Sequence, residues 1–114
     1  MQYLRKIIFY KDYFASFYVE QTEGVRKKIN YVLLLVQSQE NVPTKFLKHI
    51  ESTDGLYEIR IEHAGNIYRI FCCFDEGKLV VLFNAFQKKT QKTPQNEIEK
   101  AIKIKNEYIK SKSL

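Results

Sequence analysis

A change of hydrophobic period near residue 56 constrains the fold more than any other feature of the sequence. From Leu56 onward apolar and polar residues alternate with a period of two, as in β-strands, whereas the preceding apolar residues recur at helical spacing. Two short turn segments, Ala64–Asn66 and Asp75–Gly77, divide this stretch into three strands. Because strands joined by such short connections pair antiparallel, we predict a three-stranded meander within Gly55–Pro94.

The residues before the meander predict one further strand and two helices. Tyr3–Tyr10 is rich in β-branched and aromatic side chains, so we expect an opening strand there. A short helix is expected over Asp12–Glu20, and a longer amphipathic helix over residues 25–36, where apolar residues recur every three or four positions. With a break at Gly24 the two would form an antiparallel hairpin. Thr44–Ile50 is too short for a periodic signal, and we expect one helical turn there.

The end of the chain predicts a helix that begins after the third strand. Thr93 suits the N-cap position and Pro94 the first helical position. Its expected apolar stripe consists of Ile98, Ala101, Ile102, Tyr108 and Ile109. The predicted fold is therefore a single α+β domain over residues 1–114. In it, an antiparallel sheet, made of the N-terminal strand and the meander, packs against the N-terminal helical hairpin, with a C-terminal helix.

Positive charge is concentrated at the end of the sequence. The chain has a formal net charge of +6, from 19 Lys and Arg against 13 Asp and Glu. Residues 1–54 contribute 8 − 6 = +2, residues 55–85 contribute 3 − 4 = −1, and residues 86–114 contribute 8 − 3 = +5. The surplus thus begins where the third strand ends. Such a local excess predicts an anion-binding surface at this exit.

Several classes of protein do not fit this sequence. No run approaches the roughly 20 apolar residues of a membrane helix, and no signal-peptide pattern is found, so we expect a cytoplasmic protein. Cys72 and Cys73 are adjacent in a strand and should face opposite sides, which favours reduced thiols over a disulfide. With only these cysteines and the distant His49 and His63, the sequence predicts neither a zinc site nor a cofactor.

The remaining candidates for chemistry are cations on and beside the sheet. The sequence has no Gly-rich phosphate loop and no Ser/His/Asp arrangement. Arg69 interrupts an apolar strand, so it either pairs with a buried glutamate or faces a wet surface. Arg60 is either a binding residue or a partner in a cross-strand salt bridge. The segment QKKTQKTP, with Lys88, Lys89 and Lys92, is either a phosphate cradle at a helix start or a plain basic loop.

Four segments carry a resemblance to a known family: LYEIR, NIYRIF, LFNAFQKKTQKTP and the following EIEKA. The chain resembles the phage-derived, HigB-like branch of the RelE/ParE toxin superfamily over essentially its whole length. The resemblance implies a RelE-like fold and a toxin of a type II toxin–antitoxin pair. It implies an antitoxin partner, often with a helix-turn-helix domain. HigB and RelE members enter the ribosomal A site and cut the bound mRNA by metal-independent attack of the ribose 2′-hydroxyl on the adjacent phosphate.

The resemblance also assigns roles to individual residues. Arg69 matches the arginine that stabilises the scissile phosphate, and Arg60 matches a basic strand position that faces RNA. Lys89, with Lys88 and Lys92 beside it, matches a transition-state cation just after the last strand. The chemistry requires such cations because the phosphate gains charge during the reaction.

Two departures from the family pattern leave alternatives open. Glu58 occupies a position where RelE-branch ribonucleases have a basic residue, so it is either the base for the 2′-hydroxyl or a partner of Arg60. No His or Tyr stands in the loop after the last strand, and His63 and Gln95 remain as candidates for RNA contact. Without an identified acid, a non-enzymatic ParE-like topoisomerase poison or an inactive remnant is the alternative function. A basic surface also suits an acidic antitoxin segment.

Overall fold

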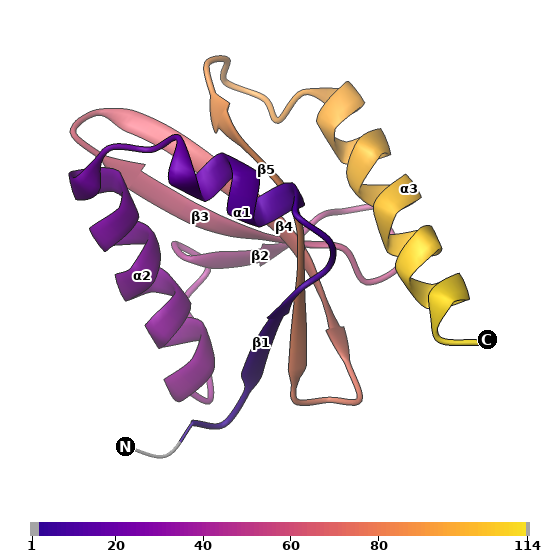
Figure 1. Cartoon of the computed structure of the whole chain (residues 1–114). Coiled ribbons are helices and arrows are strands. Elements are labelled where there is room, and N and C mark those ends of the chain that lie inside the picture. Colours follow the sequence, from indigo (N-terminus) through magenta and orange to yellow (C-terminus); the bar gives the residue numbers. More distant parts are fainter. Residues whose placement is uncertain (1–2, 114) are drawn as a thin grey trace.

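The computed structural model describes residues 3–113 and contains a five-stranded sheet with helices on both faces (Figure 1). The strand order is β1-β5-β4-β3-β2. In chain order the elements are β1 (Lys6–Phe9), α1 (Tyr13–Val19), α2 (Glu23–Ser38), β2 (Leu47–His49), β3 (Tyr57–His63), β4 (Asn66–Asp75), β5 (Leu79–Lys88) and α3 (Gln95–Ser111). The α+β class and the placement of the helices confirm the fold predicted from the sequence.

The meander is present as expected. β3 pairs antiparallel with β4, and β4 pairs antiparallel with β5. Gly65 and Gly77 lie in the two connecting turns with φ of 79° and 77°, the left-handed region that glycine adopts without strain. The short turns therefore permit the tight reversals from which the sequence predicted the meander.

The N-terminal strand pairs in the direction that was not expected. β1 runs parallel to β5, with Lys6 opposite Leu79 and Phe9 opposite Leu82. The sheet is therefore mixed rather than wholly antiparallel. A parallel pair requires a long crossover, and here the crossover comprises both N-terminal helices and three strands.

The helical turn expected over Thr44–Ile50 is confirmed only for its first residues, since the amides of Phe46 and Leu47 donate to the carbonyl of Pro43 at 2.8 and 3.1 Å. The rest of the segment is a strand. Leu47–His49 forms β2, which pairs antiparallel with β3 through Leu47 opposite Ile59 and His49 opposite Tyr57. Three residues are too few to show a period of two. The strand is specified by its partner rather than by its own sequence.

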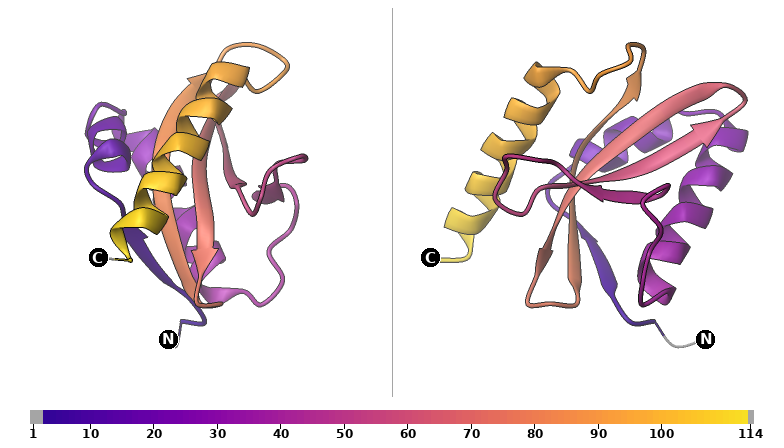
Figure 2. Two further views of the ribbon diagram at one scale, coloured as in Figure 1. Left: turned by 90° about the vertical axis from the view of Figure 1, so that its right-hand side faces the viewer. Right: turned by 180° about the vertical axis from the view of Figure 1, so that it is seen from behind.

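α1 and α2 cover one face of the sheet. Figures 1 and 2 show that the two helices diverge from their short connection rather than lying side by side as a tight hairpin. The hydroxyl oxygen of Thr22 caps α2 by accepting the amide of Val25 at 3.4 Å. The buried core on this face consists of Phe14, Val25, Ile29, Val32, Val36, Ile59, Ile61, Tyr68, Ile70, Cys72, Val80 and Leu82.

α3 covers part of the opposite face (Figure 2). Its buried core consists of Leu56, Phe71, Cys73, Val81, Phe83, Ala101, Ile104 and Tyr108. The expected stripe is therefore wrong at Ile102 and Ile109, which are 36% and 46% exposed. The two cysteines are free and lie in different cores, as their adjacency in a strand predicted.

A bulge in β5 changes which of its residues face α3. Ile70 pairs with Ala85 and Cys72 with Leu82, so two residues of β5 lie opposite the single residue Phe71. This extra residue shifts the alternation, and Phe83 and Phe86 therefore pack into the same core although three positions separate them. The alternation after the bulge carries Lys88 to the α3 side of the sheet.

Candidate functional site

A group of polar side chains occupies the part of the α3-side face that α3 leaves open. In the strand register, Glu58 lies opposite Phe71 and Arg69 lies opposite Phe86, and both phenylalanines belong to the α3-side core. Side chains of paired residues share a face, so Glu58 and Arg69 extend this face beyond the helix. We call the group Glu58, Arg60, Arg69, Lys88 and Thr93 the cationic cluster.

Two arginines lie directly opposite one another in the cationic cluster. Arg60 of β3 pairs with Arg69 of β4, and the amide of Arg60 donates away from β4, to the carbonyl of Phe46 at 2.8 Å. Such a non-hydrogen-bonded pair brings the side chains closest together, and like charges at this position repel. Glu58 offsets the repulsion because its Oε2 lies 3.0 Å from Arg60 Nε and 3.4 Å from Arg69 Nε.

The sequence left open whether these arginines pair with a glutamate, and the structure shows that both do. The partner of Arg60 is Glu58 of its own strand, which was one of the alternatives, rather than a residue across the sheet. Glu58 is 3% exposed and Arg69 is 7% exposed, so this charge arrangement lies largely out of water. Yet Nε of Arg60 and Nε of Arg69 are buried without a well-directed hydrogen bond. Glu58 therefore balances only part of the positive charge, and the two arginines keep a net charge that a further anion can neutralise.

The loop after β5 contributes a residue whose role the sequence did not indicate. Thr93 was expected to cap α3, but the N-cap residue is Pro94 and α3 begins at Gln95. The hydroxyl of Thr93 instead donates to Oε1 of Glu58 at 3.3 Å. This contact ties the basic loop to the sheet. Asn84 ties α3 in the same way, since its Nδ2 donates to the carbonyl and the carboxylate of Glu97 at 3.3 and 3.2 Å.

Lys88 is the lysine that the structure brings to the arginines. It is the last residue of β5, opposite Ile67 and on the same face as Arg69. Partial burial lowers its pKa, the charges of Arg69 and Arg60 lower it further, and Glu58 acts in the opposite direction. Burial also lowers the pKa of Arg69, again opposed by Glu58. Lys89 follows the strand, is exposed, and together with Lys88 lines a second surface hollow beside Gly65 and Gln91.

The other candidate residues lie outside the cationic cluster. His63 lies on the face that α1 and α2 cover. Its ring is so close to Gly24 of α2 that a Cβ on Gly24 would lie 2.8 Å from Nε2 of His63. Lys92 lies in the exposed loop, where its carbonyl accepts the hydroxyl of Thr90 at 2.7 Å. Gln95 is the exposed first residue of α3.

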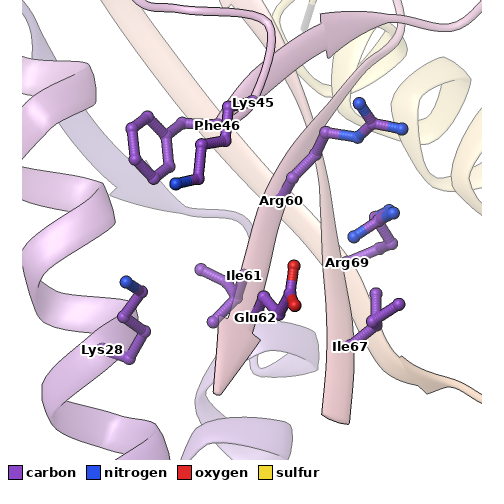
Figure 3. Close-up of a pocket in the computed structure, with 8 residues that line it drawn as sticks. All are labelled: Lys28, Lys45, Phe46, Arg60, Ile61, Glu62, Ile67 and Arg69. Carbon is purple, nitrogen blue, oxygen red and sulfur yellow. The ribbon is translucent and has the colours of Figure 1, made fainter. Parts of the chain in front are cut away.

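A pocket of about 240 Å³ continues from the cationic cluster across β3 (Figure 3). Arg60 and Arg69 line it, together with Glu62, and so do Lys28 of α2 and Lys45 of the segment before β2. Sequence reasoning missed both lysines, because neither is near the arginines along the chain. Within residues 3–113, no group of three His, Cys, Asp or Glu side chains is placed to hold a metal ion.

The arrangement is suited to holding a phosphate group. Three cations surround one carboxylate in the cationic cluster, so an excess of positive charge remains for a ligand. Arginine donors bind phosphate oxygens strongly where water is partly excluded. The neighbouring amine of Lys88, whose pKa is lowered first by burial, adds a group able to donate a proton.

Comparison with known families gives a match. Residues 17–106 match the family described as Phage derived protein Gp49-like (DUF891), a range that includes every residue of the cationic cluster. A comparison with curated proteins gives no match. None of the helices within residues 3–113 has the length and apolar character needed to cross a membrane. Since the match covers most of the sequence, the chain belongs to the phage-derived Gp49-like family.

Proposed function

We propose that this protein is the toxin of a type II toxin–antitoxin pair and that it cuts mRNA on the ribosome. The observation that carries the proposal is the pair of opposed arginines, Arg60 and Arg69, which share the single carboxylate of Glu58 on a largely buried sheet surface. The resemblance of the sequence to HigB-like and RelE-like proteins, and the membership of the Gp49-like family, support it.

The proposed reaction transfers the phosphoryl group from the 5′-oxygen of one nucleotide to the 2′-oxygen of the nucleotide before it. The 2′-oxygen bonds to phosphorus, the bond from phosphorus to the 5′-oxygen breaks, and the products are a 2′,3′-cyclic phosphate and a 5′-hydroxyl. A base takes the 2′-hydroxyl proton and an acid protonates the leaving 5′-oxygen. Arg60 and Arg69 stabilise the charge that develops on the phosphate oxygens.

The proton-transfer roles go to the two remaining ionisable groups of the cationic cluster. Glu58 is the carboxylate nearest to the arginines and is the candidate base. Lys88 is the candidate acid, because burial and the charges of Arg69 and Arg60 lower its pKa and so make its ammonium group a stronger acid. Lys89, which the resemblance favoured, is exposed beside the cluster and is proposed to contact RNA with Lys92.

The proposal is tested with Arg69→Ala in a translating extract, with transcript ends mapped by primer extension. Loss of one cation aimed at the developing charge should reduce cleavage by roughly 10²–10³. Lys103→Ala on the exposed face of α3 is the control and should cleave like the wild-type protein. Unchanged cleavage by a folded Arg69→Ala protein would refute the assignment.

A second candidate function is a non-enzymatic toxin on the same fold, such as a topoisomerase poison. This second function is favoured by the position of His63 on the face that α1 and α2 cover, since no imidazole joins the cationic cluster within residues 3–113. Induced expression separates the two: halted translation with cut transcripts supports the ribonuclease, and a DNA damage response with intact transcripts supports the poison.

The proposed partner is an antitoxin whose acidic segment covers the cationic cluster and excludes RNA. Complementary charge on such a segment would favour rapid and specific pairing. A neighbouring reading frame for a helix-turn-helix protein that co-purifies with this chain is the expected finding. An antitoxin that binds Arg60→Gln and Arg69→Gln variants as tightly as the wild-type protein would place the interface elsewhere.

A further inference from the structure

Two lysines on the far side of β3 from the arginines have no carboxylate partner. Within residues 3–113, the ion pairs involve neither Lys28 nor Lys45. Each ammonium group lies over an aromatic ring instead, Lys28 at 5.4 Å from the centroid of Tyr31 and Lys45 at 5.5 Å from that of Phe46. Cation–π contacts hold the ammonium groups while leaving their charge unneutralised.

The two lysines face the same opening. Figure 3 shows the ammonium groups of Lys28 and Lys45 in the space between α2 and β3, whereas the guanidinium groups of Arg60 and Arg69 lie beyond β3. All four cations line one pocket, in which Glu62 is the single carboxylate. The pocket is therefore a continuous cationic path across one strand rather than two unrelated patches.

The edge of β3 is open along this path. β2 pairs with β3 only as far as Ile59, and the amide of Arg60 donates to the carbonyl of Phe46. Backbone groups that point outward alternate along a strand, so the next outward amide belongs to Glu62, which lines the pocket. No strand covers β3 at this residue in the described part of the chain, which leaves room for an extended ligand.

We infer that Lys28 and Lys45 form a second phosphate subsite, which binds a backbone phosphate of single-stranded RNA next to the phosphate held by Arg60 and Arg69. The inference rests on the proposed function and names how its substrate lies on the protein. The RNA strand crosses the open edge of β3, from the cationic cluster toward α2. Contacts to successive phosphates fix the register of the strand without reading its sequence.

The test measures binding without cleavage, using a fluorescent 2′-O-methyl RNA of about ten nucleotides, a length typical of single-strand binding sites. The variant is Lys28→Gln with Lys45→Gln. Lys27→Gln with Lys103→Gln removes the same charge from exposed positions, one of them beside Lys28 on α2, and is the matched control. Circular dichroism verifies that both variants fold.

The double subsite variant should bind the RNA roughly tenfold more weakly than the control, as expected for the loss of charged hydrogen bonds. The slope of log affinity against log salt should become shallower by roughly 0.7 for the lost phosphate contact. A dinucleotide with a single phosphate should bind both variants equally, because it fills the arginine pair alone.

Three results would overturn the inference. The first is equal RNA affinity and salt slope in the subsite and control variants. The second is a loss that is as large for the single-phosphate dinucleotide as for the longer RNA. The third is unchanged RNA binding with weakened binding of an acidic antitoxin peptide, which would make the lysines a protein-docking surface. In contrast, wild-type protein that binds the RNA but cuts no transcript would overturn the proposed function and leave the subsite intact.

Discussion

Glu58 is predicted to hold the arginine pair together when no substrate is bound. The substitution Glu58→Gln preserves the size of the side chain and an oxygen able to accept the hydroxyl of Thr93, but it removes the negative charge. Arg60 and Arg69 would then lie opposite each other without a counter-charge, one of them 7% exposed. The variant should therefore be less stable than the wild-type protein.

The magnitude follows from burial. Removing one partner of a buried ion pair typically costs about 3–5 kcal/mol. The side chain of Arg60 is 27% exposed, so water screens part of the repulsion between the two arginines. We therefore expect a loss of stability at the lower end of this range, about 3 kcal/mol. With about 4–8 °C per kcal/mol for a domain near this size, the melting temperature should fall by roughly 12–24 °C.

Urea unfolding followed by circular dichroism measures this loss, and added phosphate provides the decisive comparison. An anion that binds the freed arginines at 100 times its dissociation constant stabilises the folded state by about 2.7 kcal/mol, which offsets most of the cost. Phosphate should therefore stabilise Glu58→Gln much more than the wild-type protein. A variant within about 0.5 kcal/mol of wild type, the range of ordinary surface changes, or equal stabilisation of both proteins by phosphate would refute the reasoning.

The remaining predictions concern a lysine, a tyrosine and the two cysteines. Lys88→Met should lower cleavage far more than Lys89→Met. Because a lysine that acts as an acid loses its proton as pH rises through its lowered pKa, cleavage by the wild-type protein should fall at alkaline pH. Lys88→Arg should move this fall to higher pH. If Lys89→Met is the more damaging change, the assignment is wrong. The pKa of Asp75 is lowered by a hydrogen bond from Lys112 and by a second one, 2.6 Å long, from Tyr108, and Tyr108→Phe removes the second. The stabilisation by ionised Asp75 is present above the pKa of Asp75 in the unfolded protein and is lost as pH falls through its lower pKa in the folded protein. The urea midpoints of wild type and variant should therefore differ more at pH 7 than in acid. A difference that does not change with pH would contradict this. The cysteine thiols, whose pKa values burial raises, should resist thiol-specific reagents until the protein unfolds, and rapid labelling of the native protein would show that the cores open.

The sequence predicted those parts of the fold whose signals are local. The meander followed from alternation and turn residues, and the helices followed from apolar spacing. β2 could not be found in this way, because Lys48 and His49 are polar and exposed and the strand exists only through its pairing with β3. The parallel pairing of β1 with β5 joins residues 73 positions apart, from Lys6 to Leu79, and nothing near either strand indicates it.

The candidate site was predicted in part. Glu58, Arg60 and Arg69 were identified because charges are conspicuous among apolar strand residues. Lys88 was given a lesser role than Lys89, and the bulge explains why it is Lys88 that joins the arginines. Strict alternation from Phe83 would carry Lys89 to the face of Arg69, but the extra residue in β5 carries Lys88 there instead. Thr93, Lys28 and Lys45 join the site only through the tertiary fold.

The parallel pairing of β1 with β5 has a consequence for protein synthesis. The first strand has no partner until the last strand of the sheet has been made, so the sheet cannot be completed while the chain is short. Lys88 and Thr93, which complete the cationic cluster, also come from this late segment. Non-local pairing of this kind delays folding relative to helix formation. The chain is therefore expected to assemble its cationic cluster only near the end of translation, and prematurely terminated products should lack the proposed activity.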